Sequence, residues 1–149
     1  MLDANVYHFA AMLKKFLPSL NLSNRASGVI VTASLATLTP LANNAAYHST
    51  KVFESHLCYA LQNELRSSQS KVDVLVANPS FVRTDLLGNV KAPSLFVVGP
   101  SHTVKSTLLC LGKDDRTFGS LVHEIQSYPT RLHAGLSQWI VEKITRTMY

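Results

Sequence analysis

The sequence contains little cysteine, and its two cysteines, Cys58 and Cys110, lie far apart. Each sits in an apolar stretch with helical spacing, which suits buried free thiols in a reducing compartment better than a disulfide. The six histidines show none of the spacing with cysteine or carboxylate that zinc sites use. We therefore expect no disulfide and no metal site.

Long hydrophobic runs are also missing. No apolar stretch reaches the roughly 18 to 20 residues that a membrane span needs, and we recognise no signal-peptide pattern after Met1. We expect neither feature in this chain. The apolar segment around Trp139 is expected to belong to the core or to an oligomer face, with peripheral membrane association as the alternative.

A concentrated basic surface is absent as well. The net charge is +5 and the isoelectric point is near 9.4, yet the lysines and arginines are scattered, with no aromatic platform between them. This pattern argues against nucleic-acid binding. An anionic small molecule or an anionic membrane surface explains the sign of the charge equally well.

The chain does contain enough apolar residues for one domain with a core, since 46% of its 149 residues are hydrophobic. Periodic spacing predicts a helix over residues 2 to 17, closed by Pro18, then a loop from Asn21 to Gly28. A short β-branched run at Val29–Val31 predicts a buried strand that ends at Ser34. A loop then leads to the next helix.

The middle of the chain is the most regular part. Apolar residues at three- and four-residue intervals predict one long helix from Tyr47 to about Arg66. Val72–Ala77 reads as a second buried strand, ended by Asn78-Pro79. The order helix, strand, helix, strand predicts a right-handed crossover between two parallel strands, and hence an α/β fold.

The C-terminal part is less regular. We expect Ser80–Pro100 to be a long loop of the kind that often covers a substrate. Three further elements are predicted: a helix over Val104–Leu111 capped by Ser101, a strand within Phe118–Ile125, and a final amphipathic segment over Leu132–Ile144.

Three polar residues stand out chemically. Ser34 precedes Tyr47 by thirteen residues, and Lys51 follows Tyr47 by four, which places the two side chains on one face of a helix. A fixed ammonium stabilises a phenolate and brings a phenol, with its usual pKa of about 10, closer to neutral pH. Ser34 would bind the oxygen on which charge develops. An ordinary exposed pair is the alternative for Tyr47 and Lys51.

These residues, followed after the next strand by the loop Asn78–Thr84, resemble the second half of a short-chain dehydrogenase/reductase. The resemblance implies that Tyr47 is the general acid/base, that Lys51 lowers its pKa and binds the nicotinamide ribose, and that Ser34 holds the substrate carbonyl. It also implies that Asn5 completes a water-linked proton relay. Local hydrogen bonding within its helix is the alternative for Asn5.

The loop itself departs from the family pattern, because Pro79-Ser80 stands where Pro-Gly is usual. This departure resembles the branch of 17β-hydroxysteroid dehydrogenases and very-long-chain 3-oxoacyl-CoA reductases. By the same resemblance, Tyr47, Lys51, Pro79, Val82 and Thr84 would bind the cofactor, NADP or NAD. Thr84 capping a local turn is the alternative.

The resemblance also sets expectations for the whole chain. It implies a hydrophobic substrate, fatty acyl or steroid, in a channel lined in part by residues 86–98, together with a homo-oligomer and the endoplasmic reticulum as location. We expect one partial domain, with residues 1–84 as the catalytic core and residues 85–149 as the substrate loop and C-terminal helices.

The sequence also lacks closely spaced glycines. A dinucleotide fold needs a glycine-rich turn before its first helix to hold the pyrophosphate, but no two of the six glycines are two or three residues apart. The expected fold is therefore the C-terminal half of a doubly wound parallel sheet, without the glycine-rich half. Three functions stay open: an oxidoreductase, a truncated inactive paralogue that serves as an interaction or dimerisation module, and a fragment of a longer enzyme.

Overall fold

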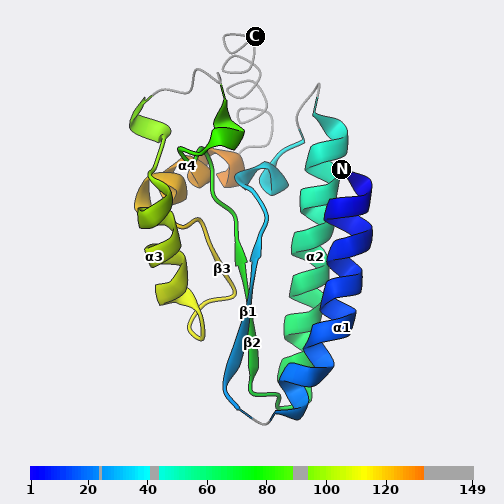
Figure 1. Ribbon diagram of the computed structural model, residues 1–149. Coiled ribbons are helices and arrows are strands. Elements are labelled where there is room, and N and C mark those ends of the chain that lie inside the picture. Colours follow the sequence, from blue (N-terminus) through cyan, green and yellow to red (C-terminus); the bar gives the residue numbers. More distant parts are fainter. Residues whose placement is uncertain (24, 41–43, 89–93, 133–149) are drawn as a thin grey trace.

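The computed structural model describes residues 1–23, 25–40, 44–88 and 94–132. A parallel three-stranded sheet lies at its centre, in the order β1-β2-β3. Helices α1 and α2 pack side by side on one side of the sheet, and α3 and α4 lie on the other (Figure 1). The element bounds are β1 Ser27–Thr32, β2 Val72–Ala77, β3 Arg116–Thr117, α1 Phe9–Leu22, α2 Ala45–Ser67, α3 Pro100–Cys110 and α4 Leu121–Leu132.

Strand β2 forms the middle of the core. It pairs in parallel with β1 from Ser27↔Val72 to Thr32↔Ala77, and with β3 on its other edge. Its side chains are nearly all buried because helices cover both faces of a central parallel strand. Within the described residues β1 has no second strand partner, so its outer edge is unpaired. The predicted α/β fold with two parallel strands is confirmed.

Helix α2 also matches its prediction closely. It packs on β1 and β2 through side chains such as Cys58 and Leu65. Gln62 lies on the same buried side, and its Nε2 donates hydrogen bonds to the carbonyl oxygens of Val74 (2.6 Å) and Asp115 (2.8 Å). The helix is therefore fixed both to β2 and to the segment that leads into β3.

The prediction that Pro18 ends the first helix is wrong. The chain begins with a π-helical turn, Asp3–His8, and α1 then continues through Pro18 to Leu22. Proline removes one backbone donor from a helix, but Leu17 and Leu20 on either side of it pack against the core. Their burial offsets the lost hydrogen bond. The predicted loop is accordingly shorter, because β1 begins at Ser27.

Two predictions near the C-terminus are also wrong. Helix α3 begins at Pro100, with Gly99 as its N-cap, so Ser101 lies inside the helix and does not cap it. The predicted strand over Phe118–Ile125 is a helix: β3 ends at Thr117, the chain turns at Gly119, and α4 follows. The hydroxyl of Ser120 accepts the His123 N–H at 3.1 Å, a helix-starting contact that opposes an extended strand.

The loop between β2 and α3 contains two short 3₁₀ turns, Asp85–Leu87 and Ser94–Phe96. The predicted final amphipathic segment falls beyond Leu132, outside the described residues. Among the helices that the structure describes, none combines the length and apolarity that crossing a membrane requires. Cys58 and Cys110 are free thiols; Cys58 is fully buried, as predicted, whereas Cys110 is only partly buried.

Candidate functional site

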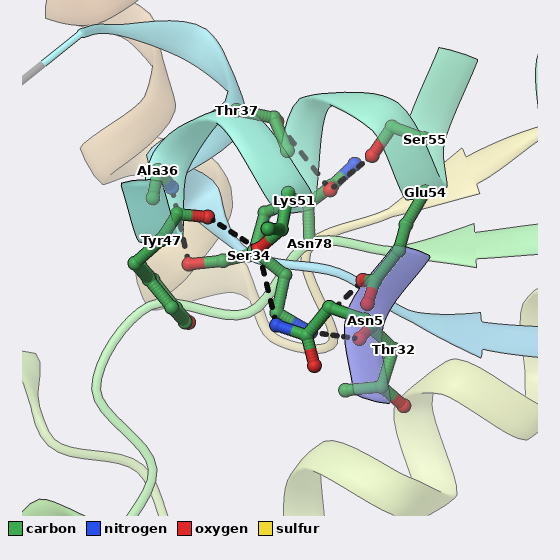
Figure 2. A network of polar contacts seen from close by, with 11 residues as sticks. Asn5, Thr32, Ser34, Ala36, Thr37, Tyr47, Lys51, Glu54, Ser55 and Asn78 are labelled. Carbon is green, nitrogen blue, oxygen red and sulfur yellow. Dashed lines mark hydrogen bonds and ion pairs between the residues drawn. The ribbon is translucent and has the colours of Figure 1, made fainter. Parts of the chain in front are cut away.

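The candidate site lies where the first turns of α2 meet the carboxyl ends of β1 and β2. Tyr47 is half-buried on the first turn, and Lys51 follows one turn later. Their side chains leave α2 toward the same side, where Asn5 also lies (Figure 2). The structure thus brings these three residues to one place, and hydrogen bonds hold them there.

Lys51 is held by two oxygen atoms. Its Nζ donates hydrogen bonds to the backbone carbonyl of Thr32 at 3.1 Å and to Glu54 Oε2 at 2.9 Å. Glu54 is only 5% exposed. Glu54 is not among the residues predicted from the sequence, although its position three residues after Lys51 on a predicted helix is a spacing that allows an ion pair.

Asn5 connects the N-terminal turn to α2. Its Nδ2 donates to Thr50 Oγ1 at 3.0 Å, and the Thr50 hydroxyl donates in turn to the backbone carbonyl of Tyr47 at 2.8 Å. Asn5 lies within the π-helical turn Asp3–His8, a distortion that often occurs at functional positions. The side chain of Asn5 therefore fixes the turn of α2 that carries Tyr47.

Ser34 follows β1 and begins a short 3₁₀ turn, Leu35–Leu38. Its Oγ accepts the backbone N–H of Ala36 at 3.1 Å. The next residue, Leu35, donates its N–H to the carbonyl of Pro79 at 2.9 Å. The serine and the proline-led loop are therefore joined directly, so the structure brings the ends of both strands together beside α2.

A buried polar layer supports this junction. Asn78 is 1% exposed, and its Oδ1 lies 3.5 Å from the hydroxyl oxygens of Thr37 and Ser55. His48 is also buried, with Nδ1 at 3.1 Å from the carbonyls of Ala36 and Thr39. These contacts fix the loop between β1 and α2. Sequence reasoning treated Asn78 only as the end of a strand and assigned no contact to His48.

The loop with the predicted cofactor residues is anchored at its middle. Val82 pairs with Val98, and the N–H of Arg83 donates to the Val98 carbonyl at 2.9 Å. Nε2 of the fully buried His123 lies 3.2 Å from the carbonyl of Phe81. Val82 is half-buried in this frame.

Thr84 lies farther out on the same loop. It is exposed and precedes the turn Asp85–Leu87, with no side-chain capping bond to it; its Oγ1 lies 3.5 Å from the Val82 carbonyl. Parts of the predicted substrate channel, residues 89–93 and the C-terminal segment, lie outside the described residues.

Burial changes the acidity of one group beside the site. Loss of solvent raises the pKa of the Cys58 thiol to about 12, and the nearby Glu54 carboxylate contributes in the same direction. Cys58 therefore stays a neutral thiol. Across the described part of the chain, no group of three or more histidine, cysteine or acidic side chains is placed to hold a metal ion.

A polar cleft of about 300 Å³ lies elsewhere, between β3 and α4. Arg131 contributes to it through an ion pair with Glu124 at 3.1 Å and by stacking over the Phe118 ring. None of the predicted site residues lines this cleft, which is formed by Cys110, Asp114, Arg116, Thr117, Phe118, Glu124 and Arg131. It is a separate feature from the Tyr47 site.

Comparisons with a family model and with known proteins point to the same family. A model of the short chain dehydrogenase family matches residues 1–94. The very-long-chain 3-oxoacyl-CoA reductase of Homo sapiens is 28% identical over 149 residues, covering 99% of this chain and 45% of the reductase. The very-long-chain 3-oxoacyl-CoA reductase-B of Danio rerio is 28% identical over 131 residues, or 87% of this chain and 40% of the reductase.

Solved structures share the fold. A structure determined in work on 7beta-hydroxysteroid dehydrogenase stereoselectivity superposes with a TM-score of 0.77 at 19% identity, covering 99% of this chain and 56% of the other. A short chain dehydrogenase from Burkholderia cenocepacia J2315 in complex with NADP gives 0.73 at 22% identity, covering 91% and 56%. The chain thus spans about half the length of the relatives that it matches.

Proposed function

The chain belongs to the short-chain dehydrogenase family, and we propose that it supplies the tyrosine–lysine part of an oxidoreductase site. The reaction would transfer a hydride between a nicotinamide cofactor and a hydrophobic ketone or alcohol. The observation that carries the proposal is the arrangement at the start of α2. There Tyr47 and Lys51 share one face beside Asn5, and Ser34 follows the adjacent strand end.

Each residue has a role in carbonyl reduction. Tyr47 would donate a proton to the carbonyl oxygen while hydride reaches the carbonyl carbon, so that the product is a neutral alcohol. Ser34 would hold the same oxygen by a hydrogen bond. Lys51 would stabilise the phenolate that Tyr47 becomes. Asn5, bound through Thr50 to the Tyr47 carbonyl, would keep this turn of α2 in place.

The residues present fit the nicotinamide side of a cofactor, whose ring supplies the hydride when it is bound. An ammonium has three N–H donors. The contacts to Thr32 and Glu54 use two donors, which leaves one for a ribose hydroxyl. We further propose that Val82 and Thr84, on the loop after Pro79, flank the ring and its phosphate. The sequence encodes no glycine-rich turn, so the chain alone is expected to bind dinucleotide weakly.

Two substrate classes are favoured by the relatives. A very-long-chain 3-oxoacyl-CoA reductase at 28% identity favours a 3-oxoacyl-CoA, and the fold shared with a structure on hydroxysteroid dehydrogenase stereoselectivity keeps a steroid as the other candidate. NADP and NAD both stay candidates, because neighbours of this fold include complexes with each. The endoplasmic reticulum is the proposed location, by analogy with the reductase branch.

The test uses the purified chain at millimolar NADPH with a long-chain 3-oxoacyl-CoA. Tyr47→Phe should lower turnover about 100-fold or more, the size of effect expected for a general acid, while NADPH binding measured by calorimetry stays nearly intact because Lys51 and the Pro79 loop remain. Lys51→Ala should impair both. Tyr59→Phe, on the same helix, is the matched control and should keep full activity. Retained activity in Tyr47→Phe would contradict the assigned role.

A second candidate function is an interaction or dimerisation module. The outer edge of β1 has no strand partner within the described residues, and α1 with the turn before it exposes Tyr7 (70%), Met12 (58%) and Phe16 (53%). Exposed strand edges and apolar patches favour association with another chain. A wild-type chain that self-associates in light scattering but shows neither turnover nor NADPH binding would favour this function over the enzyme.

A further inference from the structure

Glu54 places a carboxylate at a nearly fully buried position. Its side chain is 6% exposed and touches the ammonium of Lys51, whose own side chain is 15% exposed. Burying a carboxylate costs several kcal/mol unless it is paired and hydrogen-bonded.

Helix geometry aligns Glu54 with the catalytic pair. Lys51 follows Tyr47 by four residues and Glu54 follows it by seven, so the three side chains lie along one face of α2 over two turns. Along this face of the helix, Lys51 lies between Tyr47 and Glu54. A negative charge that develops on Tyr47 would therefore interact with a positive charge one turn away and with a negative charge two turns away.

We propose that Glu54 is a positioning residue that holds the Lys51 ammonium in place and offsets part of its charge, so that Tyr47 remains protonated to higher pH than Lys51 alone would allow. This inference rests on the proposed function of Tyr47. Its consequence is a bias of the site toward the proton-donating form of Tyr47, which carbonyl reduction requires.

Other ionisable groups near α2 do not supply the same effect. The π-helical turn that packs against α2 carries Asp3, Tyr7 and His8, all exposed to solvent. On β2, the Asp73 carboxylate accepts the Gly112 N–H at 2.7 Å. The Tyr47 ring meets the His48 ring edge-on, but Nδ1 of His48 is turned to the carbonyls of Ala36 and Thr39. The strand β1 and the turn Leu35–Leu38 contain no ionisable side chain.

The test follows the titration of Tyr47 directly, by NMR of the chain labelled with ¹³C at the tyrosine ζ carbons; the signal is assigned with Tyr47→Phe. Four proteins are compared: wild type, Glu54→Gln, Lys51→Met and the double variant Lys51→Met/Glu54→Met. We expect the titration midpoint in Glu54→Gln to fall by about one pH unit, because the full Lys51 charge then acts on the phenolate. Lys51→Met should raise the midpoint most, and the double variant should raise it less.

The test compares the order of the Tyr47 titration midpoints among the proteins. The remaining proteins can therefore still be compared if one variant does not fold. Glu64→Gln, which removes an exposed charge from the same helix, is the matched control and should leave the midpoint unchanged. An unchanged midpoint in Glu54→Gln, or equal midpoints in Lys51→Met and the double variant, would overturn the proposal.

The titration needs neither cofactor nor turnover. The NMR result can therefore be distinguished from a failure of the proposed activity. The midpoints can follow the expected order in a chain that shows no turnover. Conversely, a chain can show turnover although its midpoints do not follow that order. Where turnover is measured, the pH profile of Glu54→Gln should shift downward with the NMR midpoint. A variant that only destabilised the fold would lower the maximal turnover without shifting the pH at which turnover changes.

Discussion

The side-chain amide of Asn5 donates a hydrogen bond to the hydroxyl of Thr50, 45 residues later in the chain, at 3.0 Å. Thr50 is 1% exposed, and its own hydrogen goes to the carbonyl of Tyr47 at 2.8 Å. A single buried hydroxyl therefore connects the N-terminal turn to the residue proposed for proton transfer. The contact fixes the backbone from which the Tyr47 ring projects.

This relationship predicts that Asn5 and Thr50 stabilise the fold as a pair. Asn5→Ala and Thr50→Val should each lower the free energy of unfolding by about 1 to 2 kcal/mol, because each leaves a partner unsatisfied. In the double variant the losses should fall short of their sum by about 1 kcal/mol. Urea unfolding followed by circular dichroism measures all three, with the exposed Ser49→Ala as control. Strictly additive losses would contradict the coupling.

A second prediction concerns Cys58 and pH. Burial raises the pKa of its thiol from 9.0 to about 12, so the folded chain keeps the proton that the unfolded chain releases. The contribution of this residue to stability is therefore complete below pH 9 and is lost progressively between pH 9 and pH 12. The stability advantage of the wild type over Cys58→Ala should shrink by about 1.4 kcal/mol between pH 8 and pH 10.

Denaturant unfolding of the two proteins at both pH values gives that difference directly, and other alkaline effects cancel between them. Thiol labelling supplies an independent check. Below pH 9 the partly exposed Cys110 should react with iodoacetamide in the folded chain, and Cys58 should react only after unfolding. Rapid labelling of Cys58 in the folded chain would contradict the burial.

A third prediction concerns the turn between β3 and α4. Gly119 has φ +70°, and a Cβ added there would lie 2.7 Å from Cγ2 of Thr103. Gly119→Ala should lower the free energy of unfolding by about 2 to 4 kcal/mol, from backbone strain and from the clash together. Gly112→Ala is the matched control: its φ is +76° but nothing lies within 4 Å.

The control should therefore show the backbone cost alone, about 1 to 2 kcal/mol. Thermal unfolding followed by circular dichroism ranks the variants. Adding Thr103→Ser, which removes the clashing methyl group, should return part of the stability lost in Gly119→Ala. Equal losses in the two glycine variants would show that the close contact with Thr103 costs nothing.

The errors in the sequence-based prediction share a cause. Local rules predict a helix end at Pro18 and a helix cap at Ser101, yet α1 continues through the proline because Leu17 and Leu20 pack against the core. In the same way, the apolar residues after Phe118 suit a strand or a helix, and the turn at Gly119 with the Ser120 contact selects the helix. Local propensity is weak where tertiary packing supplies more free energy.

The sequence by itself determined the parts that depend on periodicity and spacing. The long helix follows from intervals of three and four residues, and the two strands follow from short apolar runs rich in β-branched residues. Both strands form, but only β2 is buried as predicted, because β1 is only partly covered. The spacing of Ser34, Tyr47 and Lys51 is read directly from the sequence. Only the tertiary structure decided that Asn5 reaches Thr50 and that Glu54 pairs with Lys51 in a buried setting. Burial and long-range contacts arise when separate elements pack, and no local interval in the chain encodes them.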